Sequence, residues 1–157
     1  RPLHALRQTL QGCDRAARLV EQLLTLSRLE SGASPELIEV DMAALARQVV
    51  AEVTPKALAK HQDVECRADE RAFVRGDATL LSVLVRNLFD NAVRHTPPGS
   101  TITVFARSQY GELSLGVSDD GSGVAPQDLP RLIERFYRGR DVHAEGSGLG
   151  LAIVQRI

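Results

Sequence analysis

The sequence predicts an α+β protein in which a helical segment precedes a domain of helices and strands. Between residues 13 and 30, apolar side chains recur at spacings of three and four, which is typical of an amphipathic helix. Farther along, apolar and polar residues alternate in two stretches, 102–106 and 113–117, which is typical of two paired strands. The run SGASP at residues 31–35 lies between these patterns and contains glycine and proline. We therefore expect a domain boundary there, which separates residues 1–34 from residues 35–157.

Composition excludes some classes of function. The 157 residues are 43% hydrophobic, which suits one packed domain with an appendage. The net charge of −1 provides no basic surface of the kind that binds nucleic acid, so we expect no nucleic-acid partner. Cys13 and Cys66 match no metal-ligand or CxxC spacing, and we expect reduced, buried thiols of a cytoplasmic protein. No stretch approaches the roughly 20 apolar residues of a membrane span.

The second segment begins with a short strand and a capped helix. We expect the strand at residues 37–40 and a helix that starts after Asp41, whose carboxylate can cap it. Pro55 should kink or break this helix, because proline has no N–H and clashes with the preceding turn. Alternation at residues 64–68 predicts a strand, and Phe73 can begin another.

Another capped helix comes next, and it is the most informative helix of the chain. Asp77 is placed as its N-cap. The residues expected on its apolar face are Leu81, Leu84, Val85, Leu88 and Ala92. We place a strand pair after it, around a turn at Tyr110 and Gly111, then a short helix over residues 125–135 that is entered at Pro126.

Two glycine clusters have the features of a nucleotide site. In DDGSGV, residues 119–124, a strand delivers Asp119 to its end, where the carboxylate can accept a hydrogen bond from an exocyclic amine such as that of adenine. Gly121 and Gly123 then allow the backbone to lie close to a flat ring. In GSGLG, residues 146–150, alternating glycines precede a helical run, so backbone N–H groups can face a phosphate. Either cluster alone is also compatible with a tight turn.

A third motif makes the nucleotide hypothesis more specific. In RNLFDNAVRHTP, residues 86–97, Asn87 and Asn91 lie four apart and therefore on one face of the helix. Their amide oxygens are hard ligands that suit a Mg²⁺ ion which also binds phosphate oxygens. Arg94 extends the same row toward the anion.

These motifs occur in an order that resembles one known family. NLFDNAVRHTP, DDGSG, ERFYR and GSGLGLAIV are similar to the N, G1, F and G2 boxes of two-component sensor histidine kinases, whose ATP domain belongs with the Bergerat-type ATPases. The resemblance implies a Bergerat-type α/β sandwich, with a mixed sheet that carries helices on one face. It also implies ATP and Mg²⁺ as cofactors, and transfer of the γ-phosphoryl group to a histidine and then to an aspartate of a response regulator receiver domain.

The resemblance also assigns the site residues. Asn87 and Asn91 would hold Mg²⁺ and act in catalysis, and Asp119 would contact adenine, whereas Asp120 is either a turn residue or a second acceptor. Residues 136–146 are interpreted as a mobile lid anchored by Phe136. The full set expected to contact the cofactor is Asn87, Asn91, Arg94, His95, Asp119, Gly121, Gly123, Phe136, Arg138, Gly146, Ser147, Gly148, Leu149 and Gly150.

The N-terminal segment resembles part of the dimerisation and phosphotransfer hairpin. DRAARLVEQLLTLSRLE is similar to its second helix, which implies a homodimer through this segment. RPLHALR resembles the residues just after the phosphorylated histidine of the first helix, so that histidine would lie before Arg1, and His4 would be a residue on the bundle surface. We therefore expect the chain not to phosphorylate itself. A few tens of residues that the family places between these two segments are missing, so residues 7 and 8 need not be neighbours in the native chain.

Other functions remain open at this point. One is another Bergerat-type ATPase or a serine-directed kinase, and another is a nucleotide-gated interaction module that transfers nothing. The resemblance places the chain in the cytoplasm, as part of a bacterial inner-membrane sensor that contacts the membrane only through regions outside this chain. The sequence does not reveal the signal sensed, the cognate regulator or a phosphatase activity.

Overall fold

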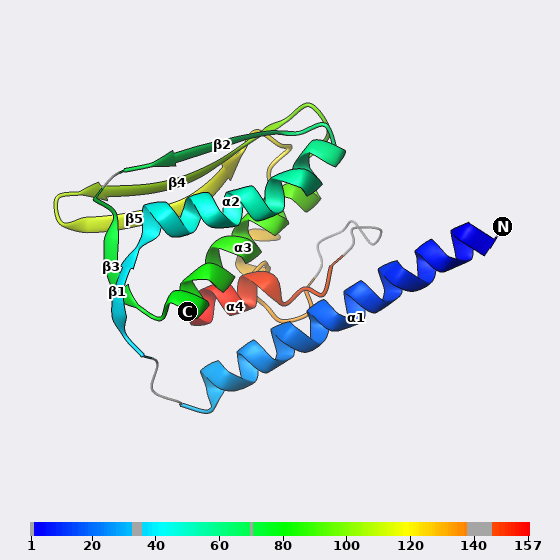
Figure 1. Cartoon of the computed structure of the whole chain (residues 1–157), viewed down its shortest axis with the longest axis horizontal. Coiled ribbons are helices and arrows are strands. Elements are labelled where there is room, and N and C mark those ends of the chain that lie inside the picture. The colour runs from blue at the N-terminus through cyan, green and yellow to red at the C-terminus, as the bar shows by residue number, and fades with distance from the viewer. Residues whose placement is uncertain (1, 33–35, 70, 138–145) are drawn as a thin grey trace. The chain divides into compact units, whose positions relative to one another are not determined.

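The chain forms two compact units, which are described separately (Figure 1). The structure is a computed structural model that describes residues 2–32, 36–69, 71–137 and 146–157. One unit consists of residues 1–33, and the other contains residues 34–155.

The first unit is a single long helix. Helix α1 runs from Pro2 to Glu30 and continues through residues 7 and 8 without interruption. Its side chains include six large apolar residues that are at least one third exposed: Leu6, Leu10, Leu19, Val20, Leu23 and Leu24. Because a helix gains most of its stability from packing an apolar face, this stripe is suited to a partner. No helix within the described residues is long and apolar enough to cross a bilayer.

A mixed three-stranded sheet is the frame of the second unit. Its order is β2 (Asp63–Ala68), β4 (Thr101–Gln109), β5 (Glu112–Asp119). Strands β2 and β4 are parallel, and β4 and β5 are antiparallel. Tyr110 and Gly111 join β4 to β5 with φ values of 54° and 81°, which suits the tight turn expected at this position. The predicted α+β fold with a mixed sheet is therefore confirmed.

Two helices cover one face of this sheet. They are α2 (Met42–Ala59) and α3 (Ala78–His95), which lie side by side against it in Figure 1. Between helices and sheet lies a single apolar core whose fully buried members include Val49, Val53, Val85, Phe89, Ile102 and Val104. Burial of side chains of this size contributes roughly 1.5–3 kcal/mol each. This core therefore fixes the orientation of α3.

A small ribbon and two capped helix starts complete the frame. Strand β1 (Ile38–Asp41) pairs antiparallel with β3 (Phe73–Gly76). As expected, Asp41 caps α2 by accepting from Ala43 N and Ala44 N at 2.9 and 3.0 Å. Asp77 caps α3 in the same way. Its Oδ1 accepts from the backbone N–H groups of residues 79 and 80 at 2.9 and 3.0 Å. Beyond the sheet, the C-terminal helix α4 spans Gly150–Arg156.

The alternative that α2 breaks at Pro55 is wrong, and the expected apolar face of α3 is correct in part. Helix α2 does not break at Pro55 but continues to Ala59. The missing hydrogen bond is offset because Val53 and Ala57, on either side of Pro55, are fully buried. On α3, the expected Val85 and Ala92 are buried and Leu81 and Leu84 pack against the core, whereas Leu88 is only partly buried. Phe89 and Val93 also belong to this face.

Two further expectations, about the helix at residues 125–135 and about the cysteines, are also wrong. Only a single 3₁₀ turn forms there, η1 (Leu129–Arg131). Pro130 favours this outcome, because within a longer helix it would remove one backbone hydrogen bond and its ring would clash with the carbonyl group four residues earlier. Cys13 and Cys66 are both exposed, not buried. Cys66 lies on β2, an edge strand of the sheet.

Candidate functional site

Helix α3 positions two of the predicted site residues against the second glycine cluster. Asn87 and Asn91 are half-buried and lie four residues apart. Asn87 Nδ2 donates to Val83 O at 2.9 Å, which fixes the orientation of the amide. Its other atom, Oδ1, would lie 3.1 Å from a methyl group added at Gly150. The Asn87 oxygen therefore faces the start of α4.

The last turn of α3 reaches the same cluster. A methyl group at Gly146 would lie 2.8 Å from a terminal nitrogen of Arg94, which is closer than such contacts allow. The guanidinium of Arg94 is thus packed directly over the Gly146 backbone. His95, the next residue, is exposed.

The residue after α3 packs against the first glycine cluster, and sequence reasoning missed it. Thr96 is 1% exposed. Its Cγ2 and Oγ1 would lie 3.4 and 3.6 Å from a methyl group at Gly121. The same methyl group would lie 2.8 Å from Asp119 Oδ1, which accepts a hydrogen bond from Gly121 N at 3.0 Å. Gly123, with φ of 71°, then carries the chain away from this turn.

The two adjacent aspartates have different surroundings. Asp120 Oδ1 accepts from Thr101 N at 2.8 Å, so this carboxylate fastens the end of β5 to the start of β4. Asp119 is exposed, and its hydrogen bond to Gly121 N is a local one. A carboxylate has about four lone-pair sites, so Asp119 retains capacity to accept from a ligand.

The second glycine cluster is also joined to the segment that carries Phe136. Phe136 N donates to Gly148 O at 2.9 Å, and a methyl group at Gly148 would lie 2.7 Å from Phe136 Cα. Phe136 has a φ of 63° and is 62% exposed. Leu149 is fully buried, and its N–H bonds to Ser147 Oγ at 3.2 Å. Arg138, with the rest of residues 138–145 of the predicted lid, lies outside the described residues.

Tyr137 is held by two side chains of the preceding segment. Its hydroxyl donates to Asp128 Oδ1 at 2.9 Å, and Arg131 lies over its ring, 4.2 Å from the centroid. The hydrogen bond to the Asp128 carboxylate raises the pKa of Tyr137. These contacts hold the chain beside Phe136, where it meets Gly148.

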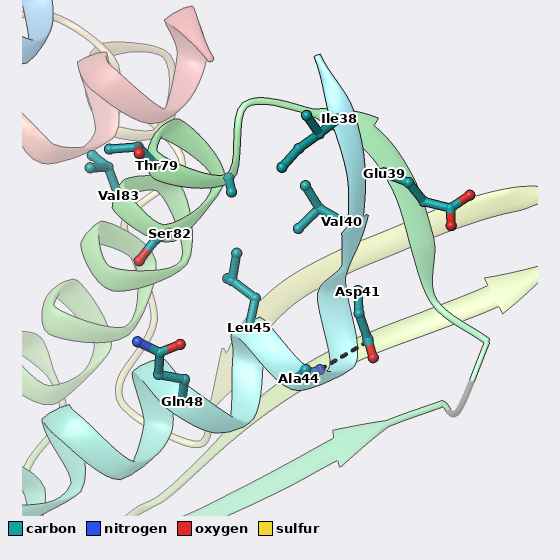
Figure 2. Close-up of a pocket in the computed structure, with 11 residues that line it drawn as sticks. Ile38, Glu39, Val40, Asp41, Ala44, Leu45, Gln48, Thr79, Ser82 and Val83 are labelled. Atoms are coloured by element: carbon teal, nitrogen blue, oxygen red, sulfur yellow. Dashed lines mark hydrogen bonds between the residues drawn. The ribbon is translucent and has the colours of Figure 1, made fainter. Parts of the chain in front are cut away.

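A cavity of about 620 Å³ lies elsewhere on the second unit, between β1, the start of α2 and the start of α3 (Figure 2). None of the predicted site residues lines it. Its lining consists of Ile38, Glu39, Val40, Asp41, Ala44, Leu45, Gln48, Ala78, Thr79, Ser82 and Val83. This set offers neither a glycine-rich backbone nor a basic side chain, so it is a poor phosphate site.

The amide side chains on α3 are of a kind that could bind the Mg²⁺ ion and nucleotide phosphates predicted from the sequence. Asn87 presents an amide oxygen toward Gly150, and Asn91 lies one turn farther along the helix. Neutral oxygen ligands of this kind suit Mg²⁺ together with phosphate oxygens. Within the described residues, no group of three or more His, Cys, Asp or Glu side chains could hold a metal ion. The two asparagines could offer amide oxygens to Mg²⁺ beside the phosphates of a nucleotide.

Comparison with known proteins identifies the family. The profile described as "Histidine kinase-, DNA gyrase B-, and HSP90-like ATPase" matches residues 76–157, which is more than half of the chain. The chain belongs to this ATPase family, as a sensor histidine kinase catalytic domain. The sensor protein QseC of Salmonella typhi is 43% identical over 155 residues, which cover 98% of this chain and 34% of QseC. QseC of Escherichia coli K12 is 44% identical over the same length. The chain thus spans about a third of these curated relatives.

Solved structures of histidine kinases agree with this membership. The mycobacterial sensor histidine kinase MprB matches with a TM-score of 0.66 and 31% identity, over 76% of each chain. Full-length ShkA in complex with AMPPNP matches with a TM-score of 0.79 and 30% identity, over 93% of this chain and 31% of ShkA. An ATP-binding domain of this family is therefore present.

The comparison with QseC also corrects the expected gap in the histidine kinase hairpin. The alignment with QseC spans 155 residues and includes 98% of this chain, so it contains no gap of tens of residues. The expectation of a deletion or an artificial join between these residues is wrong. This expectation arose because the seven residues RPLHALR are too few to show which amphipathic helix of the family they resemble.

We predict that Gly148→Ala destabilises the kinase domain more than Gly99→Ala does. Both glycines have positive φ, 69° and 83°, so each substitution carries a left-handed penalty of roughly 1–2 kcal/mol. Only at Gly148 does the added methyl group also collide with backbone, which should add about 1–3 kcal/mol. Urea unfolding of both variants measures the difference. Equal losses would show that the junction between Phe136 and the glycine cluster is not tight.

Proposed function

We propose that this chain binds Mg²⁺·ATP and transfers the γ-phosphoryl group to a histidine on a dimerisation helix, from which an aspartate of a response regulator takes it. The main support for the proposal is the packing of one helix end against both glycine clusters. Arg94 lies over Gly146 and Thr96 lies against Gly121, so a nucleotide held along α3 would meet both clusters.

Each part of the site has a separate task in this proposal. Asp119 accepts a hydrogen bond from the adenine amine, while Gly121 and Gly123 leave room for the ring. Arg94 and the backbone of residues 146–150 hold phosphate oxygens, and Phe136 and His95 border the nucleotide. Asn91 and Asn87 hold Mg²⁺, which supplies neutralisation of phosphate charge when bound.

In this proposal, the residues of the site contribute to the reaction by positioning the nucleotide relative to the acceptor. Phosphoryl transfer through a loose transition state needs little covalent participation by the protein, and its rate depends on the alignment of the acceptor with the phosphate. A rigid platform meets this requirement. Helix α3 is such a platform, because its inner face is buried in the core and its first turn is capped by Asp77.

The partners are inferred from α1 and from the relatives. The exposed apolar stripe of α1 suits packing against a second copy, which would give a homodimer through residues 1–34, with residues 35–157 as the catalytic domain. The relatives are named sensor proteins, and one solved structure is the cytoplasmic segment of QseC, which is 32% identical with a TM-score of 0.55. We infer the same place for this chain, as the cytoplasmic part of a bacterial inner-membrane sensor that works with a response regulator.

Transfer of label to a separate acceptor tests the proposal. The chain is incubated with γ-labelled ATP and a dimerisation hairpin that contains a phospho-accepting histidine. We expect acid-labile label on the hairpin with Mg²⁺ and none after chelation of the metal. The same hairpin with that histidine replaced by alanine is the control.

Two outcomes would contradict the proposal in different ways. Nucleotide binding without any transfer would favour a nucleotide-gated interaction module. Acid-stable label would favour a serine-directed kinase.

We also predict that Asp119→Asn weakens ATP binding much more than Asp120→Asn. The first change removes a charged acceptor from the adenine position, which should cost about 1.5–3 kcal/mol. The second alters a carboxylate that is engaged with Thr101 N, and an amide oxygen can still accept there, so affinity should change by less than about 0.5 kcal/mol. Titration calorimetry with Mg²⁺·ATP measures both. Equal affinities would mean that the adenine acceptor has been assigned to the wrong residue.

A further inference from the structure

The end of α3 is clamped by two side chains from the connection between α2 and β2. Lys60 Nζ donates to Val93 O at 2.5 Å, to Arg94 O at 3.1 Å and to Thr96 O at 3.5 Å. Gln62 Nε2 donates to two of the same carbonyls, Val93 O at 3.1 Å and Thr96 O at 2.6 Å. All three donors of the ammonium group are thus used.

Helix chemistry explains why these donors are effective at this place. The last four carbonyl groups of a helix have no partner within it, and they carry the negative end of the helix dipole. An ammonium group beside the last turn donates to these carbonyl groups and also interacts favourably with the negative end of the dipole. Pro97 directly follows Thr96, and since proline has no N–H it cannot supply a backbone donor there.

The clamp itself is rigidly built. The backbone N–H groups of Lys60 and Gln62 both donate to Ala57 O, at 2.9 and 3.0 Å. Between them, His61 has a φ of 56°, and its carbonyl accepts from Gly99 N at 2.7 Å. This turn therefore ties the end of α2 to the loop after α3.

The clamped turn is the one that carries contacts to both glycine clusters. The Arg94 side chain packs on Gly146, and the Thr96 side chain packs on Gly121 beside Asp119. The carbonyls that Lys60 holds include those of Arg94 and Thr96 themselves. A change in the position of this turn would therefore displace the phosphate side and the adenine side of the site together.

We infer that Lys60 and Gln62 are positioning residues of the nucleotide site. They do not contact ATP. They fix the turn from which Arg94 and Thr96 reach the two glycine clusters. The inference rests on the proposed function, because it needs ATP to bind between those clusters.

The buried amide of Gln62 separates positioning from simple packing. The residue is 1% exposed, yet its Oε1 has no hydrogen-bond partner within the described part of the chain, and the same holds for the buried Oγ1 of Thr96. An apolar side chain of similar size would avoid this penalty but would remove both donors to the end of α3. The amide therefore keeps one unpaired oxygen while both of its N–H donors hold the carbonyl groups of Val93 and Thr96 at the end of α3, which suits a positioning role.

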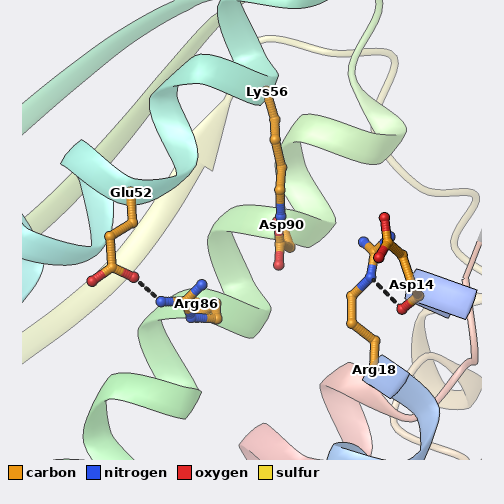
Figure 3. Close-up of polar contacts among 6 residues, drawn as sticks. All are labelled: Asp14, Arg18, Glu52, Lys56, Arg86 and Asp90. Atoms are coloured by element: carbon orange, nitrogen blue, oxygen red, sulfur yellow. Dashed lines mark hydrogen bonds and ion pairs between the residues drawn. The ribbon is translucent and has the colours of Figure 1, made fainter. Parts of the chain in front are cut away.

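The chain contains a matched control for Lys60. Lys56 lies one turn earlier on α2 and pairs with Asp90 of α3 at 3.1 Å, and its side chain is 49% exposed (Figure 3). Figure 3 also shows the neighbouring pair of Glu52 and Arg86, which joins the same two helices. Lys56→Met removes the same charge from the α2 and α3 interface as Lys60→Met, but away from the clamped turn.

Calorimetric titration of the whole chain with Mg²⁺·ATP tests the inference. We expect Lys60→Met to weaken binding about tenfold and Lys56→Met to leave it within about twofold. Lys60→Arg should restore most of the affinity, because guanidinium also donates to carbonyl groups. In amide NMR spectra without nucleotide, the signals of Gly121 and Gly146 should shift in Lys60→Met and not in Lys56→Met.

The outcomes distinguish this inference from the function on which it rests. If the wild-type chain is folded and does not bind Mg²⁺·ATP, the proposed function fails and the inference fails with it. If the wild-type chain binds and the two methionine variants bind alike, only the inference is wrong. Should Lys60→Met not fold, Gln62→Met decides. It keeps the size and loses both donors, so unchanged affinity in that variant would contradict a positioning role.

Discussion

The close packing of the C-terminal end of α3 against the two glycine clusters is the constraint on which the site depends. At Gly146 and Gly121, an added methyl group would collide with side chains of this helix end or of the turn itself, and at Gly150 it would press on Asn87 Oδ1. The missing side chain at these glycines lets the backbone lie close to α3, and the atoms that meet the added methyl group are ends of side chains. This packing brings motifs that are distant in the sequence into one row along the helix.

The rest of the domain keeps that helix in place. The sheet and α2 bury its inner face at Val85, Phe89 and Val93, Asp77 caps its first turn, and Lys60 and Gln62 clamp its last. Polar contacts at the ends set the position along the helix axis, while the apolar core sets the rotation about it. A phosphoryl-transfer site needs both, because a small displacement of the aligned groups costs a large factor in rate.

Helix caps and the tight turn were predicted correctly from the sequence, whereas the course of α2 and of residues 125–135 was not. The caps at Asp41 and Asp77 and the tight turn at Gly111 are confirmed, since each depends on residues within one turn. The break considered at Pro55 does not occur, because the buried residues on either side of it hold α2 together. The roles of Asn87, Asn91 and Asp119 remain predictions. The clamp was not predictable, because Gln62 meets Val93 and Thr96 only after the parallel pairing of β2 and β4 has formed.

The decisive measurement is the location of bound nucleotide on the domain. Amide NMR of the whole chain, titrated with Mg²⁺ and a non-hydrolysable ATP analogue, reports which backbone groups sense the ligand. We expect shifts at Asn91, Gly121 and Gly146, with little change at Ile38 and Ser82, which line the separate cavity. Shifts that gather around Ile38 and Ser82, while the glycine clusters stay unchanged, would contradict a nucleotide site along α3.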